Sequence, residues 1–176
     1  MNTMGLKSVL KKLHKADKIP NTKSKETKVK KEITKKEPKP KKEKKKPENL
    51  IEKLKLDGND IDMIAKMVMA EAEGECFKGK VAVANVIISR VESDLFPNTV
   101  KEVIFQKGQF EPILNGRYFK VEPNGECKKA VKEALQGNWA VPKGTYFFLN
   151  EAKVGLPNFF KEREFVVKID NHSFYA

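Results

Sequence analysis

The sequence predicts an α+β domain over about residues 50–176, preceded by a basic tail. Two observations predict this fold class. Apolar residues recur at helical spacing up to about residue 137, and strand-like segments come only after that point. The chain also has no internal repeat, so the helices and strands belong to one arrangement. Helices first and short strands last indicate a helix-rich domain with a small C-terminal β element.

The charge of the chain separates the tail from the domain. Residues 1–50 hold 18 Lys and 6 acidic residues, whereas residues 51–176 hold 18 Lys or Arg and 18 Asp or Glu. The formal net charge of +12 therefore belongs to the tail, and no basic face is expected on the domain. Residues 17–48 are dominated by Lys, Glu, Pro and Thr and have too little apolar surface to fold, which predicts a disordered linker. This linker either attracts anionic polymers or is a soluble spacer.

A short amphipathic helix is predicted near residues 4–15, within the tail of residues 1–49. The apolar residues at helical spacing, with lysines around them, are Leu6, Val9, Leu10 and Leu13. Such a short helix is marginal alone, which favours docking on a partner or a membrane surface. No apolar run approaches the roughly 18 residues of a membrane span, and the N-terminus lacks the apolar core of a secretory signal. We therefore expect synthesis in the cytoplasm without a signal peptide.

Two long helices are expected at the start of the domain. The first is capped by Asn59 or Asp60 and runs to about Glu71. Its apolar face consists of Ile61, Ile64, Ala65, Val68 and Ala72. The second, over about residues 79–91, is apolar on nearly all sides. Helices of that kind are buried, so we expect this one at the centre of the domain.

Shorter elements complete the predicted domain. A third helix follows Pro97 and Asn98, and a fourth is expected over residues 124–137, where Gly137 ends it. Strand-like segments lie at residues 145–149 and 164–169. The expected inward positions are Val100, Val103 and Ile104 in the third helix, Cys127, Ala130, Val131, Ala134 and Leu135 in the fourth, and Phe165, Val167 and Ile169 in the last strand.

The cysteine and histidine content argues against a fold held together by disulfide bonds or by a structural metal ion. The chain has only Cys76 and Cys127, with His14 and His172, which is too few for a disulfide framework or a convincing structural zinc site. We interpret both cysteines as small core residues. Neither a metal nor an organic cofactor is expected.

The strongest candidate for chemistry is the acidic segment from Glu71 to Glu75. Its three glutamates crowd a helix C-terminus, whose partial negative charge disfavours acidic residues. Positions that break a local rule are where functional sites are expected. Glu71 lies three residues after Val68, on the edge of the apolar stripe, so it should face a cleft. Burial there would raise its pKa, as a general acid requires.

The other glutamates are less clearly placed. Glu73 is turned away from Glu71, and Glu75 lies beyond Gly74, which we expect to allow a sharp exit from the helix. Cleavage of a glycosidic bond usually needs two carboxylates, and Glu73, Glu75 and Glu111 are the candidates for the second. A lytic transglycosylase needs only one, because the 6-hydroxyl of the sugar attacks the anomeric carbon. The alternative is a solvated helix end with three exposed glutamates.

Longer segments around these glutamates resemble a known family. Residues 70–75 (AEAEGE) and 79–91 (GKVAVANVIISRV) are similar to the cell wall hydrolase family of the spore cortex-lytic enzymes. The resemblance continues in order through residues 96–100 (FPNTV), 109–112 (QFEP), 146–150 (YFFLN) and 172–176 (HSFYA), and covers about residues 60–176. It implies a compact lysozyme-like domain that cleaves glycan strands between N-acetylmuramic acid and N-acetylglucosamine, in several members with a 1,6-anhydro product. The family's catalytic glutamate falls on Glu71.

Further residues are expected to bind the substrate. Gln109 would bind sugar hydroxyls, Phe110 would be an aromatic platform for a pyranose ring, and Glu111 is a further substrate-binding residue. Tyr146 and Asn150 would bind N-acetyl groups. For Phe110 and Tyr146, the alternative is ordinary core packing. His172 lines the cleft or orients a carboxylate, although a hydrogen-bonded structural role is the favoured interpretation.

The sequence therefore predicts an enzyme that cleaves peptidoglycan glycan strands with Glu71 as acid and then base. It would act at the cell wall or spore cortex, or during phage lysis, with the Lys-rich tail attracted to anionic wall polymers. A hydrolytic muramidase remains an alternative. So does an amidase or peptidase that uses Cys76 or Cys127 with His172. A third alternative is a non-enzymatic binding protein whose tail holds nucleic acid, which the intact glutamate motif disfavours.

Overall fold

Residues 49–176 are described by a computed structural model, in which most of the helices precede the three strands of a small sheet. The predicted linker at residues 17–48 and the helix near residues 4–15 lie outside the described residues. The elements in chain order are α2 (Leu50–Leu54), α3 (Gly58–Ala72), α4 (Phe77–Val91), α5 (Val100–Ile104), α6 (Glu111–Leu114), η1 (Arg117–Phe119), α7 (Gly125–Leu135), β1 (Phe147–Leu149), α8 (Glu151–Val154), α9 (Asn158–Lys161), β2 (Phe165–Ile169) and β3 (His172–Tyr175). The α+β prediction is confirmed.

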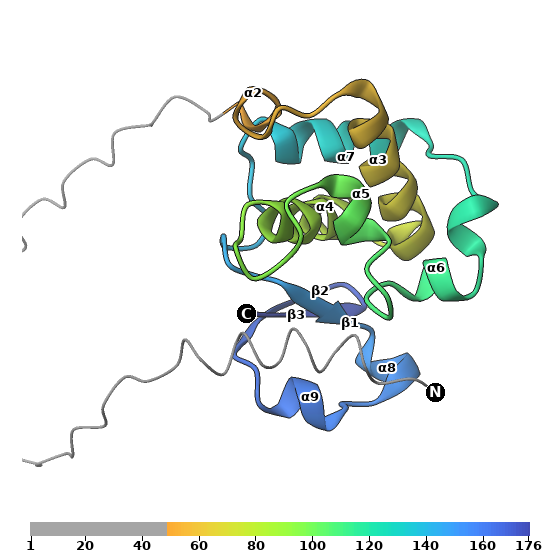
Figure 1. Cartoon of the computed structure of the whole chain (residues 1–176). Coiled ribbons are helices and arrows are strands. Elements are labelled where there is room, and N and C mark those ends of the chain that lie inside the picture. Colours follow the sequence, from red (N-terminus) through yellow and green to blue (C-terminus); the bar gives the residue numbers. More distant parts are fainter. Residues whose placement is uncertain (1–48) are drawn as a thin grey trace, which may run out of the picture.

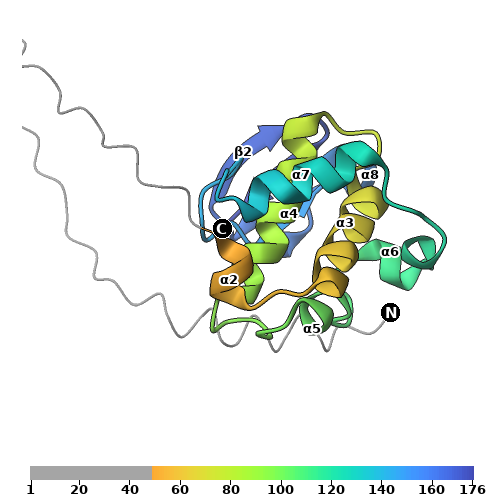
Figure 2. The same cartoon turned by 90° about the horizontal axis from the view of Figure 1, so that it is seen from above.

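The sheet lies between two unequal helical layers. Helices α2 to α7 lie on one side of it, and the short helices α8 and α9 lie on the other (Figure 1). Seen from above, α7 crosses α4 and α3 lies beside α4 (Figure 2), and α4 packs against α3, α5 and α7. No helix of residues 49–176 is long and apolar enough to span a membrane.

Helix α4 is the buried centre that its apolar sequence predicted. Every residue from Gly79 to Val91 is buried, and the helix begins slightly earlier than expected, at Phe77. The predicted inward faces of α5 and α7 are also buried. Helix α7 is followed by Gly137, whose φ of 83° is easily adopted only by glycine.

The start of α3 differs from the prediction. The N-cap is Asp57, not Asn59 or Asp60, and the helix begins at Gly58. The Asp57 side chain accepts a hydrogen bond from the Asp60 backbone N–H (2.9 Å), and the Asp60 side chain accepts one from the Asp57 N–H (3.2 Å). This reciprocal capping box satisfies two backbone donors together, which a cap at Asp60 alone would not do.

The three-stranded antiparallel sheet has the order β1-β3-β2. Strand β3 was not predicted, because all four of its residues are buried and two are polar, so it lacks an alternating pattern. In β2, Val167 and Ile169 face the core, but Phe165 is 55% exposed. The pairing register with β3 shifts between Phe165 and Val167, which turns Phe165 to the opposite face, where its ring contacts Tyr175 (5.7 Å).

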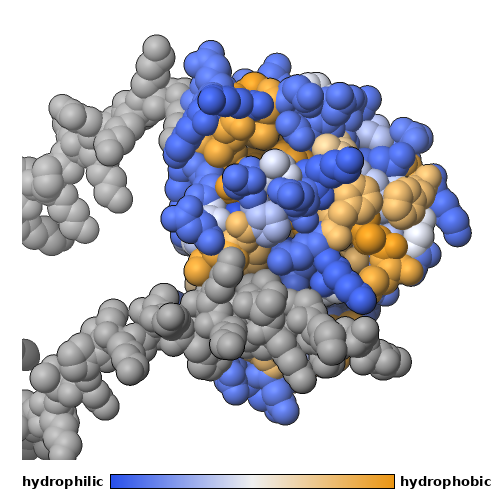
Figure 3. All heavy atoms as spheres, viewed as in Figure 1, coloured by the Kyte–Doolittle hydropathy of each residue, from blue (hydrophilic) through white to orange (hydrophobic). Residues whose placement is uncertain are grey.

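Apolar side chains are exposed beside α5 and α6. Leu114 and Phe119 are 68% and 62% exposed, and the Phe119 ring stacks on Phe105 with centroids 6.2 Å apart. In Figure 3, apolar side chains gather on the right of the molecule, where Figure 1 places α5 and α6. This patch lies beside elements that line the cavity described next.

Candidate active site

A cavity of about 770 Å³ lies at the C-terminal end of α3. Its walls come from α3, α4, the α6 region, the β1–α8 connection and the start of β3. Among the residues singled out from the sequence, those that line it are Glu71, Glu73, Glu75, Gln109, Glu111, Asn150 and His172. Segments far apart in the sequence therefore meet in one polar cavity.

Glu71 has the electrostatic environment of a general acid. Burial raises its pKa from an ordinary value of 4.5 to about 7, and the negative charge of Glu111 adds to the rise. The positive charges of Arg90, Lys153 and Arg117 act in the opposite direction. Near neutral pH, a large share of the molecules therefore carries a protonated Glu71, which can donate a proton to a leaving oxygen.

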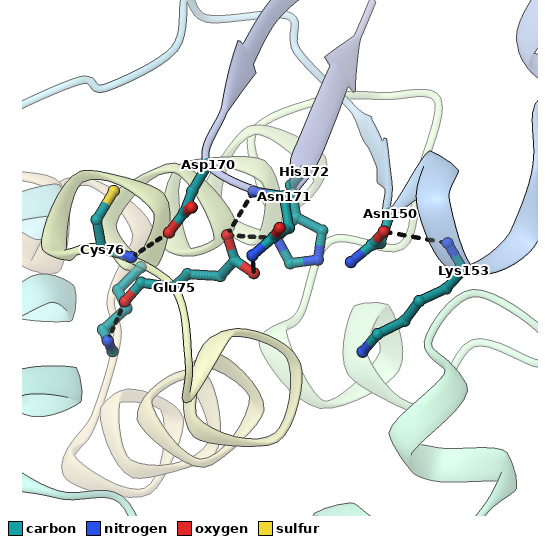
Figure 4. A network of polar contacts seen from close by, with 8 residues as sticks. Glu75, Cys76, Asn150, Lys153, Asp170, Asn171 and His172 are labelled. Carbon is teal, nitrogen blue, oxygen red and sulfur yellow. Dashed lines mark hydrogen bonds and ion pairs between the residues drawn. The ribbon is translucent and has the colours of Figure 1, made fainter.

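Glu75 is buried and held at both carboxylate oxygens. The backbone N–H of Asn171 donates to Oε2 (3.0 Å), and its side-chain amide donates to Oε1 (3.1 Å), as Figure 4 shows. The Lys80 ammonium donates to the Glu75 carbonyl. Gly79 allows the two segments to approach closely, because a Cβ at that position would lie only 3.1 Å from the Glu75 Cβ. Glu75 thus anchors the α3–α4 connection to the β2–β3 turn.

A second contact joins the same two segments. The Cys76 N–H donates to Asp170 Oδ2 (2.8 Å), and Asp170 itself has a φ of 53° in the turn (Figure 4). The expected need for glycine at position 74 is not observed, since a Cβ there would meet nothing within 4 Å and Gly74 has no positive φ. The close approach is at Gly79 instead.

Glu73 lies at the rim of the cavity, where it is paired with Arg117. The Arg117 guanidinium donates to Glu73 Oε2 and, through Nε, to the carbonyl of Ala70 (3.0 Å). Both side chains are about half exposed. The ion pair neutralises Glu73 and holds the residues after α6 against the end of α3.

His172 lines the cavity as a neutral side chain. Burial lowers its pKa, and its Nδ1 lies 3.9 Å from Glu75 Oε2, too far for a hydrogen bond. The ring contacts Phe148 (centroids 5.1 Å apart), and Nδ1 has no hydrogen-bond partner among residues 49–176. The favoured interpretation of His172 as a hydrogen-bonded structural residue is therefore not supported at Nδ1.

Asn150 caps helix α8 at the edge of the cavity. Its side-chain oxygen accepts from the Lys153 backbone N–H (3.2 Å), and the Lys153 side chain extends from α8 in Figure 4. The Tyr175 hydroxyl donates to Glu151 (2.7 Å), which fixes α8 to the central strand. Asn150 and Lys153 are therefore presented to the cavity from a short but anchored helix.

Phe110 and Tyr146 do not line the cavity, so the structure gives no support to their expected contacts with sugars. Phe110 is only 2% exposed, because its ring packs against Phe148 and the Arg90 guanidinium. Tyr146 packs on Phe96, with ring centroids 5.2 Å apart. These contacts favour the alternative of core packing for both residues.

Several cavity residues were missed by the sequence analysis. They are Arg90, Arg117, Phe148, Lys153 and Asn171. Arg90 had a detectable signal, since it is an arginine in a helix predicted to be buried. The other residues enter the site through contacts between distant segments, which spacing along the chain does not reveal.

The two cysteines have different environments, and neither lines the cavity that contains His172. Cys127 is buried as expected, but Cys76 is exposed, so its interpretation as a core residue is wrong. Among residues 49–176, no three His, Cys, Asp or Glu side chains are grouped so as to hold a metal ion. Because neither cysteine lines the cavity with His172, the cysteine–histidine pair of an amidase or peptidase has no geometric support.

This difference predicts selective labelling. Under native conditions, a thiol reagent should modify Cys76 quickly and Cys127 only after unfolding, since burial also raises the pKa of the Cys127 thiol. Mass spectrometry of labelled peptides would check this, with Cys76→Ser as the matched control. Rapid labelling of Cys127 in the folded protein would contradict the packing of α7.

Comparison with known proteins gives consistent matches. A family model described as Cell Wall Hydrolase matches residues 74–175, beginning just after Glu71. The spore cortex-lytic enzyme of Oceanobacillus iheyensis is 40% identical over 92 residues, which are 52% of this chain and 33% of that enzyme. That of Bacillus cereus is 38% identical over 116 residues, 66% of this chain and 44% of that enzyme. This chain thus spans less than half the length of these relatives.

A solved structure also matches. The catalytic domain of a germination-specific lytic transglycosylase, SleB from Bacillus anthracis, is 36% identical to this chain, with a TM-score of 0.62. The match covers 69% of this chain and 97% of that domain. The similarity therefore extends over nearly the whole of that catalytic domain.

Proposed function

This chain belongs to the cell wall hydrolase family, and on that premise we propose that it cleaves peptidoglycan glycan strands between N-acetylmuramic acid and N-acetylglucosamine. The family resemblance found in the sequence is confirmed by these matches. The proposed enzyme is a lytic transglycosylase with Glu71 as its single acid and base. The observation that carries the proposal is Glu71 in a polar cavity with a pKa of about 7.

In the first proposed step, Glu71 donates its proton to the oxygen that links the two sugars, and the bond from that oxygen to the anomeric carbon breaks. In the second step, the Glu71 carboxylate takes the proton of the muramic acid 6-hydroxyl, whose oxygen then bonds to the anomeric carbon. Glu71 ends protonated, and the product is a 1,6-anhydro sugar. A pKa near neutrality suits a group that must both donate and accept a proton.

The surroundings of the other carboxylates favour the single-glutamate mechanism. Glu73 is paired with Arg117, and both oxygens of Glu75 accept hydrogen bonds from Asn171. Glu111 has no such partner among the described residues, and its charge acts directly on Glu71. If water rather than the 6-hydroxyl attacks, Glu111 is therefore the carboxylate that would activate it.

The proposed glycan contacts come from several walls of the cavity. Gln109, Glu111 and Asn150 offer polar groups for sugar hydroxyls and N-acetyl groups, and His172 adds a neutral imidazole. Phe148 lines the cavity and takes the place of Phe110 as the aromatic contact. For the Lys-rich tail, outside the described residues, we propose attraction to anionic wall polymers.

Product analysis tests the reaction type. Purified peptidoglycan digested with the full chain should release muropeptides with anhydromuramic ends, each lighter by one water than a hydrolysis product, as measured by mass spectrometry. A digest with the Glu71→Gln variant is the negative control, and it should release no such muropeptides. Reducing muramic ends would instead establish a muramidase, and cleavage of amide bonds alone would overturn the proposed function.

A further inference from the structure

Arg90 is a buried cation held in a fixed position near the end of α4. It is 3% exposed, and its Nε donates to the carbonyl of Tyr146 (2.8 Å). The guanidinium carbon lies 5.0 to 5.5 Å from the ring centroids of Phe96, Phe110 and Phe147. Three aromatic rings and one hydrogen bond to a backbone carbonyl therefore hold the guanidinium in place. It is held without an ion pair to a carboxylate.

The positive charge of Arg90 is not compensated by an ion pair. None of the salt bridges among residues 49–176 involves Arg90, and its Nη1 is buried without a hydrogen-bond partner there. Burial lowers its pKa to about 9, and the charge of Glu71 is what opposes this fall. Both residues line the same cavity. A buried charge in this condition is costly, so a function for it is expected.

We propose that Arg90 is a positioning residue that supplies the counter-charge for the Glu71 carboxylate formed when Glu71 donates its proton. This inference rests on the proposed function and deepens it. Arg90 acts through Glu71 and does not touch the substrate in this role. The buried cation is thus explained by a partner that becomes charged only during the reaction.

The arrangement stabilises the reaction more than the resting state. Protonated Glu71 gains little from a neighbouring cation, whereas the developing carboxylate is attracted to it in an environment of low dielectric constant. Only interactions that strengthen toward the transition state accelerate a chemical step. Because the rings hold the guanidinium in place beforehand, little reorganisation is needed when the charge appears.

Several other charges act on Glu71 and must be separated from Arg90. They are Glu111 on α6, which raises its pKa, and Lys153 on α8 and Arg117 on η1, which lower it. Glu73, Glu75 and the neutral His172 also line the cavity. Loss of the positive charge of Arg90 alone should raise the pKa of Glu71. The loss of activity at high pH should therefore begin at a higher pH.

The test compares Arg90→Met, which removes the charge from the aromatic cluster, with Arg90→Lys, which retains it. Cleavage of soluble glycan strands is measured across the pH range. For Arg90→Met we expect kcat to fall about 100-fold with little change in KM. The alkaline limb of the pH profile, where activity falls at high pH, should move up by about one pH unit. Arg90→Lys should recover part of kcat and keep the limb near that of the wild type.

The matched control is Arg163→Met. The Arg163 guanidinium also lies over Phe147 (5.3 Å) and Phe159 (4.9 Å), but Arg163 does not line the cavity. Its replacement removes a similar cation from the aromatic cluster and should leave the alkaline limb unmoved. An Arg90→Met protein whose limb coincides with that of the wild type would overturn the proposal and leave Arg90 a packing role.

A measurement without turnover separates this inference from the proposed function. The Glu71 carboxyl carbon can be titrated by NMR in isotope-labelled wild type and Arg90→Met, with Glu71→Gln used to assign the signal. Arg90→Gln replaces Arg90→Met if the latter does not fold. A raised Glu71 pKa in the uncharged variant supports the pairing whatever reaction is catalysed, and an unchanged pKa overturns it. Unimpaired cleavage by Glu71→Gln would instead overturn the assignment of Glu71 as the acid, on which this inference rests, even where the titration shows that the two side chains are electrostatically coupled.

Discussion

Glu71→Gln should lower the rate of glycan cleavage by about 1,000-fold, because glutamine cannot donate a proton to the leaving oxygen. The substitution is nearly isosteric, so substrate binding should change little. Release of soluble muropeptides from purified peptidoglycan measures the loss. Glu73→Gln is the matched control, since Glu73 lies on the same turn but is paired with Arg117 at the rim, and should keep most of the activity.

The same variant should show the electrostatic cost of Glu71 in its stability. The pKa of about 7 in the folded protein exceeds the ordinary 4.5, so the folded state disfavours the charged form. Below about pH 4.5, Glu71 is protonated in both states and the wild type and variant should be equally stable. As the pH rises from about 4.5 through 7, the free energy of unfolding of the wild type should fall by about 3 kcal/mol relative to that of the variant. Thermal unfolding at acidic and alkaline pH checks this, and equal pH dependence would contradict the raised pKa.

Glu75→Ala should destabilise the domain by about 3 kcal/mol, the largest loss expected from a single change in the acidic segment. It removes a buried carboxylate and leaves two donors of Asn171 without their acceptor. Glu73→Ala, the control, breaks an ion pair between half-exposed side chains and should cost less than about 1 kcal/mol. Urea unfolding of the three proteins measures the difference.

Glu75→Gln distinguishes anchoring from chemistry. It retains the packing and one acceptor oxygen, so it should be less stable than the wild type by roughly 1 kcal/mol and still cleave glycan strands. If this variant were as stable as the wild type but inactive, Glu75 would be a reacting group. The two-carboxylate mechanism, with a hydrolytic product, would then replace the single-glutamate mechanism.

The helical part of the fold was well predicted from the sequence because its signals are local. The continuous apolar surface of α4 and the apolar stripe of α7 can be recognised within single segments. The sheet was harder, since β1 is short and β3 is buried on both faces and carries a histidine and a serine. The bulge that turns Phe165 outward depends on pairing with β3 and has no signal within β2.

The candidate site was predicted in part. The position of Glu71 on the edge of an apolar stripe indicated a cavity wall, and Glu71 does line the cavity. The structure does not support the expected roles of Phe110 and Tyr146, because an aromatic residue beside a loop packs inward as readily as it faces a ligand. Asn171 could not be found at all, since its only sign of importance is a contact with a distant glutamate.

That contact joins positions 96 residues apart, and β3 is the middle strand, without which β1 and β2 have no partner in the sheet. Bringing the two ends of so long a loop together costs chain entropy before the contacts between them can stabilise the fold. We therefore expect such pairings to form late in folding. The helices around α4 can collapse earlier from contacts nearer in sequence. We therefore expect catalytic competence to arrive with the final folding event, after the helical core has already condensed around Glu71.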